Sequence, residues 1–285
     1  MDHYAVIGNP VGHSRSPWIH QRFAHDTEQS LTYNARLAPI DGFQESVNLF
    51  QTDGGKGLNV TVPFKQEAFH LATQHSERAQ LAEAVNTLIW TGTHWRGDNT
   101  DGIGLCRDLL QCGFMVPGKR IVILGAGGAV QGLLPVLLEQ QPLSVYILNR
   151  TVSRAQALVD RMQPLAPHTP LKALAWDANI AEPVDGIIQA TSTALLTSTA
   201  SHESVTTPNE DPFQSLKFSC NPDAWCYDLV YGQAAKVTAQ WAASRQLRFA
   251  DGLGMLVEQA AESFWLWRNI RPETRQVLSD LRKLI

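Results

Sequence analysis

Short apolar segments alternate with longer segments of helical periodicity along most of this 285-residue chain. Strands that alternate with helices form parallel βαβ units with helices on both faces, so the alternation predicts an α/β fold. The predicted strands cover residues 4–8, 31–37, 57–60, 84–90, 120–124, 145–149, 171–175, 186–190, 225–229 and 247–249. The predicted helices cover residues 17–25, 43–50, 64–70, 103–111, 130–139, 153–162, 234–243 and 256–267.

The alternation restarts after a turn-rich joint at residues 114–119, which predicts a second domain. We place that domain at residues 112–250 and the first domain at 1–111 plus 251–285. The last segment returns to the first domain in this prediction, because its helix carries apolar residues at helical spacing. Residues 196–221 are rich in Thr, Ser, Pro and Asn and lack periodicity, so we expect a long loop there.

The charge balance and the cysteines exclude several classes of protein. The net charge is -4 and no run of Lys and Arg occurs, which disfavours a nucleic-acid partner. No apolar run approaches the ~20 residues of a membrane span, and the N-terminus lacks a basic segment followed by a long apolar one. The spacing of the four cysteines fits no zinc pattern, and their small number suits a reducing compartment. We therefore expect a cytoplasmic protein without a metal site.

A glycine-rich turn follows the predicted strand at residues 120–124 and precedes a helical segment. This is the setting in which backbone amides at a helix start bind the pyrophosphate of a dinucleotide. Val130 interrupts the last small position of the fingerprint, and a turn used only for packing is the alternative. The predicted cofactor-binding residues of the turn are Gly125, Ala126, Gly127, Gly128 and Ala129.

The next predicted strand ends in Asn149, Arg150 and Thr151, and Arg154 follows. An NAD-dependent enzyme usually has an acidic residue here that binds the ribose 2′-hydroxyl. Two guanidinium groups with a hydroxyl suit a 2′-phosphate instead, which predicts NADP. The alternative is an exposed basic helix start without a ligand.

Serine residues lie at the start of the first predicted helix. Ser16 precedes Pro17 and is expected to be its N-cap, while Ser14 has no evident local task. Hydroxyl groups at a helix N-terminus can bind a carboxylate. The two serines are therefore candidates for substrate binding.

Further polar residues follow strands that are expected to end at a ligand crevice. Asn59 and Thr61 share one face of a strand, and Lys65 lies just beyond them as a candidate general acid/base. A lone lysine is more often a surface charge. Asn86 stands among apolar neighbours, and Asp101 opens a helix, where N-capping is its alternative role.

In this order the polar motifs closely resemble those of the shikimate dehydrogenase family, nearly from end to end. The resemblance rests on residues 8–17, 55–65, 84–87, 97–102, 125–129, 149–154 and 251–260. It implies two α/β domains around a deep cleft, the second a Rossmann-type NADP-binding domain. It also implies reversible reduction of 3-dehydroshikimate to shikimate with NADPH, in chorismate and aromatic amino-acid biosynthesis.

The resemblance assigns roles to individual positions. Lys65 and Asp101 correspond to the catalytic pair. The residues that would bind the substrate are Ser14, Ser16, Asn59, Thr61, Asn86, Asp101, Tyr231 and Gln259. The cofactor side adds Glu77, Thr191, Leu229 and Gly252.

The chain departs from the family pattern only on the cofactor side. Val130 and Gln131 stand where the family commonly has Ser and Arg, and Gln189 stands where it has Asn. The loop at residues 196–221 also looks longer than usual. These departures bear on the affinity for the cofactor, while the identity of the substrate does not depend on them.

Two other functions fit parts of the pattern. One is a quinate/shikimate dehydrogenase with broader substrate or NAD use, against which Arg150 and Arg154 argue. The other is a catalytically idle NADP-binding sensor, against which Lys65 and Asp101 argue. The expected partner is a small-molecule substrate, and the expected assembly is a monomer or a homodimer.

Overall fold

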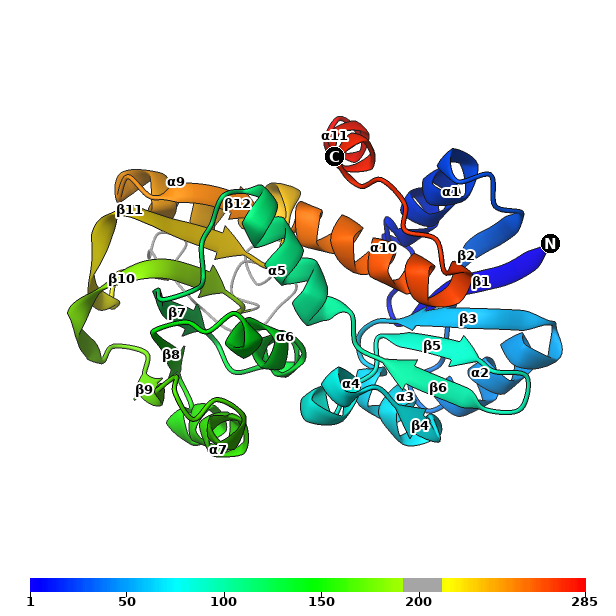
Figure 1. Cartoon of the computed structure of the whole chain (residues 1–285), viewed down its shortest axis with the longest axis horizontal. Helices are drawn as coiled ribbons and strands as arrows, with labels where there is room; N and C mark the ends of the chain where they lie inside the picture. The colour runs from blue at the N-terminus through cyan, green and yellow to red at the C-terminus, as the bar shows by residue number, and fades with distance from the viewer. Residues whose placement is uncertain (192–211) are drawn as a thin grey trace, which may run out of the picture. The chain divides into compact units, whose positions relative to one another are not determined.

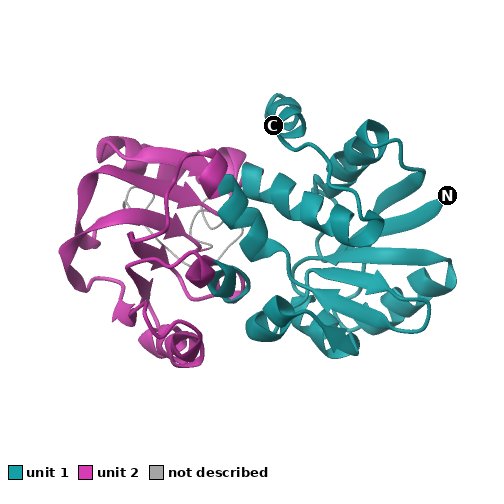
Figure 2. Cartoon of the chain, viewed as in Figure 1, with its two compact units in different colours: residues 1–108, 131–136, 254–285 teal, residues 109–130, 137–253 magenta. Residues whose placement is uncertain are grey.

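The computed structural model describes residues 1–191 and 212–285, which divide into two compact units (Figure 2). Unit 1 comprises residues 1–108, 131–136 and 254–285. Unit 2 comprises residues 109–130 and 137–253. The sequence predicted joints after residues 111 and 250, and it did not assign the helical residues 131–136 to the first unit.

Unit 1 contains a six-stranded sheet in the order β2-β1-β3-β5-β6-β4 (Figure 1). Its strands are β1 (Asp2–Gly8), β2 (Leu31–Leu37), β3 (Gly55–Val60), β4 (Gln74–His75), β5 (Thr87–Trp90) and β6 (Trp95–Asp98). Its helices are α1 (Ser16–Asp26), α2 (Phe43–Thr52), α3 (Lys65–Leu71), α4 (Glu77–Ala82), most of α5 (Asp101–Gln111), α10 (Leu253–Arg268) and α11 (Arg275–Arg282).

Strand β1 shows why this sheet is covered on both faces. Its apolar side chains alternate, and Ala5 and Ile7 join a core cluster with side chains of α2 and α3. Tyr4 and Val6 point to the opposite face and pack with Tyr33 of β2. A strand with apolar residues on both faces requires a helical layer on each side.

The first sheet is mixed, which the sequence did not predict. β1 pairs in parallel with β2 and β3, whereas β5 runs antiparallel to both β3 and β6. Only a tight turn joins β5 to β6, closed by the Thr91 amide donating to the His94 carbonyl at 3.0 Å. A turn this short permits an antiparallel hairpin and no crossover helix.

Unit 2 contains a second six-stranded sheet, in the order β12-β11-β10-β7-β8-β9 (Figure 1). All its neighbouring strands are parallel. Its strands are β7 (Arg120–Leu124), β8 (Ser144–Asn149), β9 (Leu171–Ala175), β10 (Asn179–Gln189), β11 (Lys217–Asp228) and β12 (Arg248–Asp251). Its helices are α6 (Gly128–Glu139), which it shares with unit 1, α7 (Val152–Met162), α9 (Lys236–Ser244) and the 3-10 turns η1 (Gln163–Leu165) and η2 (Gly232–Ala235).

Counted along the chain from β7, the strand order of unit 2 is that of a Rossmann fold, in which the order reverses between the first and fourth strands. Here these strands are β7 and β10. Ligands of such sheets bind outside the carboxyl ends of the strands at this switch point. The predicted α/β fold with a Rossmann-type second domain is therefore confirmed.

Some elements were predicted too short, and others were not predicted at all. β10 begins at Asn179, and β11 at Lys217, inside the segment predicted as a long loop. The sequence reading missed β4, β6, α4 and α11. The first part of the predicted loop, up to residue 211, lies outside the described residues. Within the described ranges no helix is long and apolar enough to cross a lipid bilayer.

Candidate active site

Lys65 and Asp101 form an ion pair in unit 1. Lys65 is the first residue of α3 and Asp101 the first of α5, and Lys65 Nζ donates to Asp101 Oδ2 at 2.5 Å. The side chain of Lys65 is 29% exposed and that of Asp101 is 10% exposed. An ammonium group has three hydrogens, so Lys65 can donate to a second oxygen while it keeps this contact.

The second carboxylate oxygen of Asp101 is also held. Asn86 Nδ2 donates to Asp101 Oδ1 at 2.8 Å, and Thr100 N donates to Asn86 Oδ1 at 2.9 Å. The backbone supports the same arrangement, because Val85 N donates to the carbonyl of Lys65 at 2.9 Å. Asp101 is therefore oriented by a buried amide, and its carboxylate in turn orients the lysine.

A buried polar network continues behind Asn86. Asn59 Oδ1 accepts from the Tyr33 hydroxyl at 2.7 Å, and Asn59 Nδ2 donates to Ser263 Oγ at 2.9 Å. Thr87 links Ser263 to Asn86 through hydrogen bonds of 2.8 and 2.9 Å. Both the oxygen and the nitrogen of the Asn59 amide thus form hydrogen bonds with other side chains of the protein. A network of satisfied polar groups makes a rigid support for the residues above it.

Sequence reasoning missed the members of this network that lie on other elements. These residues are Tyr33 on β2, Thr87 on β5, Thr100 before α5 and Ser263 on α10. One signal was available, because Ser263 lies one helical turn after Gln259 on the same face of α10. The others are brought together only by strand pairing.

The two serines near the start of α1 differ from their predicted local roles, which were an N-cap for Ser16 and no local task for Ser14. Arg15 is the N-cap of α1, without a side-chain capping bond, and Ser16 is the first helical residue. Ser14 has the local task instead, because its Oγ accepts from the Ser16 amide at 3.3 Å. Ser16 is buried and Ser14 half-buried. The N-cap prediction for Ser16 is wrong, yet both hydroxyls still lie at a helix N-terminus.

The remaining predicted substrate residues, and Glu77 of the predicted cofactor side, are distributed over both units. Thr61 follows β3 and packs so closely on Gly8 that a Cβ atom there would lie 2.4 Å from Thr61 Cγ2. Gln259 belongs to the network of unit 1, since its Oε1 accepts from Thr100 Oγ1 at 3.3 Å. Glu77 is exposed at the start of α4 in unit 1, whereas Tyr231 belongs to unit 2.

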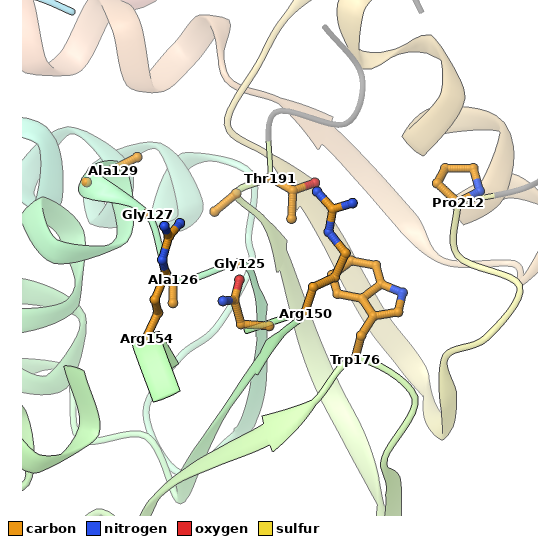
Figure 3. A pocket seen from close by; sticks show the side chains of 12 residues that line it. Gly125, Ala126, Gly127, Ala129, Arg150, Arg154, Trp176, Thr191 and Pro212 are labelled. Carbon is orange, nitrogen blue, oxygen red and sulfur yellow. The ribbon is translucent and has the colours of Figure 1, made fainter. Parts of the chain in front are cut away.

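Unit 2 has a cavity of about 470 Å³ at the glycine turn (Figure 3). The turn residues Gly125, Ala126, Gly127, Gly128 and Ala129 line it, together with Asn149, Arg150, Arg154, Trp176, Ala190, Thr191 and Pro212. The turn follows β7 and Thr191 follows β10, so the cavity lies at the switch point of the sheet.

The glycines of the turn meet the requirements of a phosphate site. Gly125 has a φ of +110°, a conformation that side chains rarely adopt, and an added Cβ would lie 3.1 Å from Thr191 Cγ2. Gly127 is the N-cap of α6 and Gly128 its first residue, and a Cβ at either would meet no atom within 4 Å. Open space thus lies before the first amides of the helix, where a phosphate binds.

The basic residues lie beside this turn. Arg150 and Arg154 are exposed and line the same cavity, and Figure 3 shows both side chains there. Asn149 Nδ2 donates to the carbonyl of Thr151 at 2.8 Å, which shapes the chain between β8 and α7. Thr151 is the N-cap of α7 and is not among the lining residues.

Leu229 and Gly252 lie together beyond the ends of β11 and β12 and do not line this cavity. A Cβ atom on Gly252 would lie 2.3 Å from the carbonyl oxygen of Leu229, so only glycine fits without a shift of the backbone. The Leu229 amide donates to the Gln189 carbonyl at 3.0 Å, which places this pair next to the end of β10.

Gln189, the residue that departs from the family pattern, is buried at the end of β10. Its Oε1 accepts from both the amide and the hydroxyl of Thr191, each at 3.1 Å. Gln189 therefore orients Thr191, which lines the cavity. The longer side chain is accommodated as a support for the strand end.

Asp228 neighbours Gln189 in the sheet and is almost fully buried. Burial raises the pKa of its carboxyl to about 6, against a hydrogen bond from the Val230 amide at 3.1 Å, and the charge of Asp251 raises it further. The pKa of Asp228 is higher in the folded protein than in the unfolded chain. Its ionisation therefore lowers the free energy of unfolding progressively as the pH rises from about 4 to about 6, and the full loss is present above that.

We expect Asp228→Asn to stabilise the protein more at neutral pH than at acid pH. The amide keeps the acceptor for Val230 and removes the buried charge, whose cost at pH 7 is about 3 kcal/mol. The gain in the free energy of unfolding should grow by roughly 1 kcal/mol between about pH 5 and about pH 7, measured by urea titration. The exposed Asp177→Asn is the matched control, and a gain that does not depend on pH would contradict the prediction.

Three family models match this chain, and all three describe parts of shikimate dehydrogenases. The substrate-binding domain model matches residues 6–88, the shikimate/quinate 5-dehydrogenase model residues 109–215, and the C-terminal domain model residues 252–280. A shikimate dehydrogenase (NADP(+)) of Acidovorax ebreus is 47% identical over 287 residues, covering 100% of this chain and 97% of the relative.

Solved structures agree with these matches. An Ael1 enzyme from Pseudomonas putida has a TM-score of 0.85 at 38% identity, covering 99% of this chain and 98% of that one. The shikimate 5-dehydrogenase of Thermus thermophilus, crystallised with NADP(H) and shikimate, has a TM-score of 0.81 at 26% identity, and each chain is covered completely. With full-length identity near one half and matching models over most of its length, the chain belongs to the shikimate dehydrogenase family.

Proposed function

We propose that this chain catalyses the reversible reduction of 3-dehydroshikimate to shikimate with NADPH. The observation that carries the proposal is the Lys65–Asp101 pair, held from behind by Asn86, in a chain of this family. Residues 1–111 with 251–285 would bind the substrate, and residues 112–250 would bind the cofactor. The reaction then belongs to the biosynthesis of chorismate and aromatic amino acids.

The residues of unit 2 fit NADP(H). The open space before Gly127 and Gly128 suits a pyrophosphate at the start of α6. Arg150 and Arg154 line the same cavity, where an acidic residue would be expected for NAD. We assign the 2′-phosphate to these two guanidinium groups and the neighbouring Thr151.

Lys65 is the proton donor in the proposed reduction. When bound, NADPH supplies the hydride that reduces the ketone carbon. The ammonium of Lys65 transfers a proton to the oxygen that becomes the shikimate hydroxyl, and Lys65 accepts this proton in the reverse direction. Asp101 holds Lys65 through Oδ2 and aligns the reacting oxygen.

The substrate itself is bound by polar groups of known position in unit 1. Ser14 and Ser16 lie at the start of α1, where hydroxyl and amide groups suit the carboxylate of shikimate. We assign the hydroxyl groups of the ring to Asn59, Thr61, Asn86 and Gln259, and to Tyr231 of unit 2. On the cofactor side, we assign contacts to Glu77, Thr191, Leu229 and Gly252.

A direct assay tests this function. Purified protein mixed with shikimate and NADP⁺ should produce NADPH, followed by its absorbance, and quinate or NAD⁺ should give little turnover. Turnover of quinate at a comparable kcat/KM would support the broader quinate/shikimate activity instead. Binding of NADPH without any turnover of shikimate would support a sensor. We further propose a cytoplasmic monomer or homodimer, which light scattering on the purified protein would test.

A further inference from the structure

Trp176 is an aromatic wall of the cofactor cavity that none of the sequence motifs includes. It follows the last residue of β9, and β9 pairs with β8 so that Ala175 is opposite Asn149. Trp176 and Arg150 are therefore the next residues beyond that pair, each just past the end of one of two adjacent parallel strands. Both line the cavity, and Figure 3 shows both side chains at it.

The indole of Trp176 is held from behind. Trp176 is half-buried and packs against a core cluster of unit 2 that includes Leu124 and Leu148. A large side chain anchored in this way offers the cavity a fixed, flat surface. Among the described lining residues it is the one aromatic side chain.

We propose that the adenine of NADP(H) stacks on the indole of Trp176. The proposal rests on the proposed function, because it takes NADP(H) as the ligand. The pyrophosphate lies at the glycine turn and the 2′-phosphate at Arg150 and Arg154, so the base at the far end of the same nucleotide must meet the wall beside Arg150. A flat heterocycle gains most from an aromatic surface.

Stacking on Trp176 predicts that loss of Trp176 and loss of Arg150 have different effects on the preference for NADP over NAD. The base is common to NADP and NAD, whereas the 2′-phosphate belongs to NADP alone. Loss of the indole should therefore weaken both cofactors by the same factor and leave the preference for NADP unchanged. Loss of Arg150 should change the preference itself.

The test is calorimetric and needs no turnover. The probes are 2′,5′-ADP, which has the base and both phosphates, and pyrophosphate, which lacks the base. Trp176→Leu should raise the Kd for 2′,5′-ADP roughly 5- to 100-fold, as for other base–aromatic contacts, and leave the Kd for pyrophosphate unchanged. Trp176→Phe should retain most of the affinity, because it keeps an aromatic face.

Fluorescence supplies a second readout that does not depend on the folding of the leucine variant. Adenine stacked on Trp176 should quench part of the wild-type emission, and this quenching should be absent in Trp176→Phe. It should persist in Trp265→Phe, which removes a tryptophan that is 41% exposed on α10.

Unchanged 2′,5′-ADP binding by Trp176→Leu, or equal losses for 2′,5′-ADP and pyrophosphate, would overturn the stacking role. Quenching that persists in Trp176→Phe would overturn it as well. A wild-type chain that fails to bind 2′,5′-ADP would instead overturn the NADP site, and with it the proposed function.

Discussion

Lys65→Met is expected to lower kcat for shikimate oxidation at least ~10²-fold, with little change in KM for shikimate. Methionine has nearly the length of lysine but cannot transfer a proton. The loss therefore falls on the chemical step, while the other groups of unit 1 still bind the substrate. Steady-state kinetics with shikimate varied at saturating NADP⁺ measure both constants.

Two further variants make this result specific. Lys56→Met removes an exposed lysine of β3 and should leave kcat unchanged. Asp101→Asn should also lower kcat, because the amide retains the bond geometry but loses the charge that holds Lys65 at 2.5 Å. A kcat near that of the wild type for Lys65→Met would rule out Lys65 as the acid/base.

Arg150→Asp is expected to weaken NADPH binding by roughly 10²-fold and to improve the use of NADH. The change removes a charge-assisted hydrogen bond to the 2′-phosphate, worth about 1.5–3 kcal/mol, and adds repulsion between two negative groups. The new carboxylate can also accept a hydrogen bond from the ribose 2′-hydroxyl of NADH, as in NAD-dependent enzymes. The ratio of kcat/KM for the two cofactors measures the switch.

Arg275→Asp is the matched control for this charge change. It makes the same change in net charge at an exposed position of α11 in unit 1, and Arg275 is not among the residues that line the cavity. Its cofactor preference should equal that of the wild type. If Arg150→Asp also keeps the wild-type preference, Arg150 does not bind the 2′-phosphate.

The sequence predicted the bounds of three strands correctly. Residues 120–124 are a strand with the bounds predicted, because a β-branched, leucine-ended run favours a buried strand. Residues 31–37 and 171–175 also have the bounds predicted, although each contains a single buried residue. β6 was missed because Trp95–Asp98 contains Arg, Gly and Asp, which disfavour a strand, and pairing with β5 and β4 overrides that preference.

For the same reason, the sequence predicted only the last parts of the long strands β10 and β11 of unit 2. β10 contains Pro183 and two charged residues, Glu182 and Asp185, before its apolar end, and its pairing with β11 shifts register on either side of Val184. Pairing to a neighbour, rather than local composition, extends such strands through irregular segments. The apolar ends at Gly186 and Trp225, which lie next to each other, were the parts visible in the sequence.

The sequence alone determined the chemistry of single positions. Gly125 adopts a φ that other residues avoid, and basic residues in place of an acid after β8 indicate a phosphate. The tertiary structure decided which groups meet. Lys65 and Asp101 are 36 positions apart, and Trp176 lies next to Arg150 because β8 and β9 pair in one register. Such pairings depend on the packing of whole elements, and no local pattern of residues encodes them.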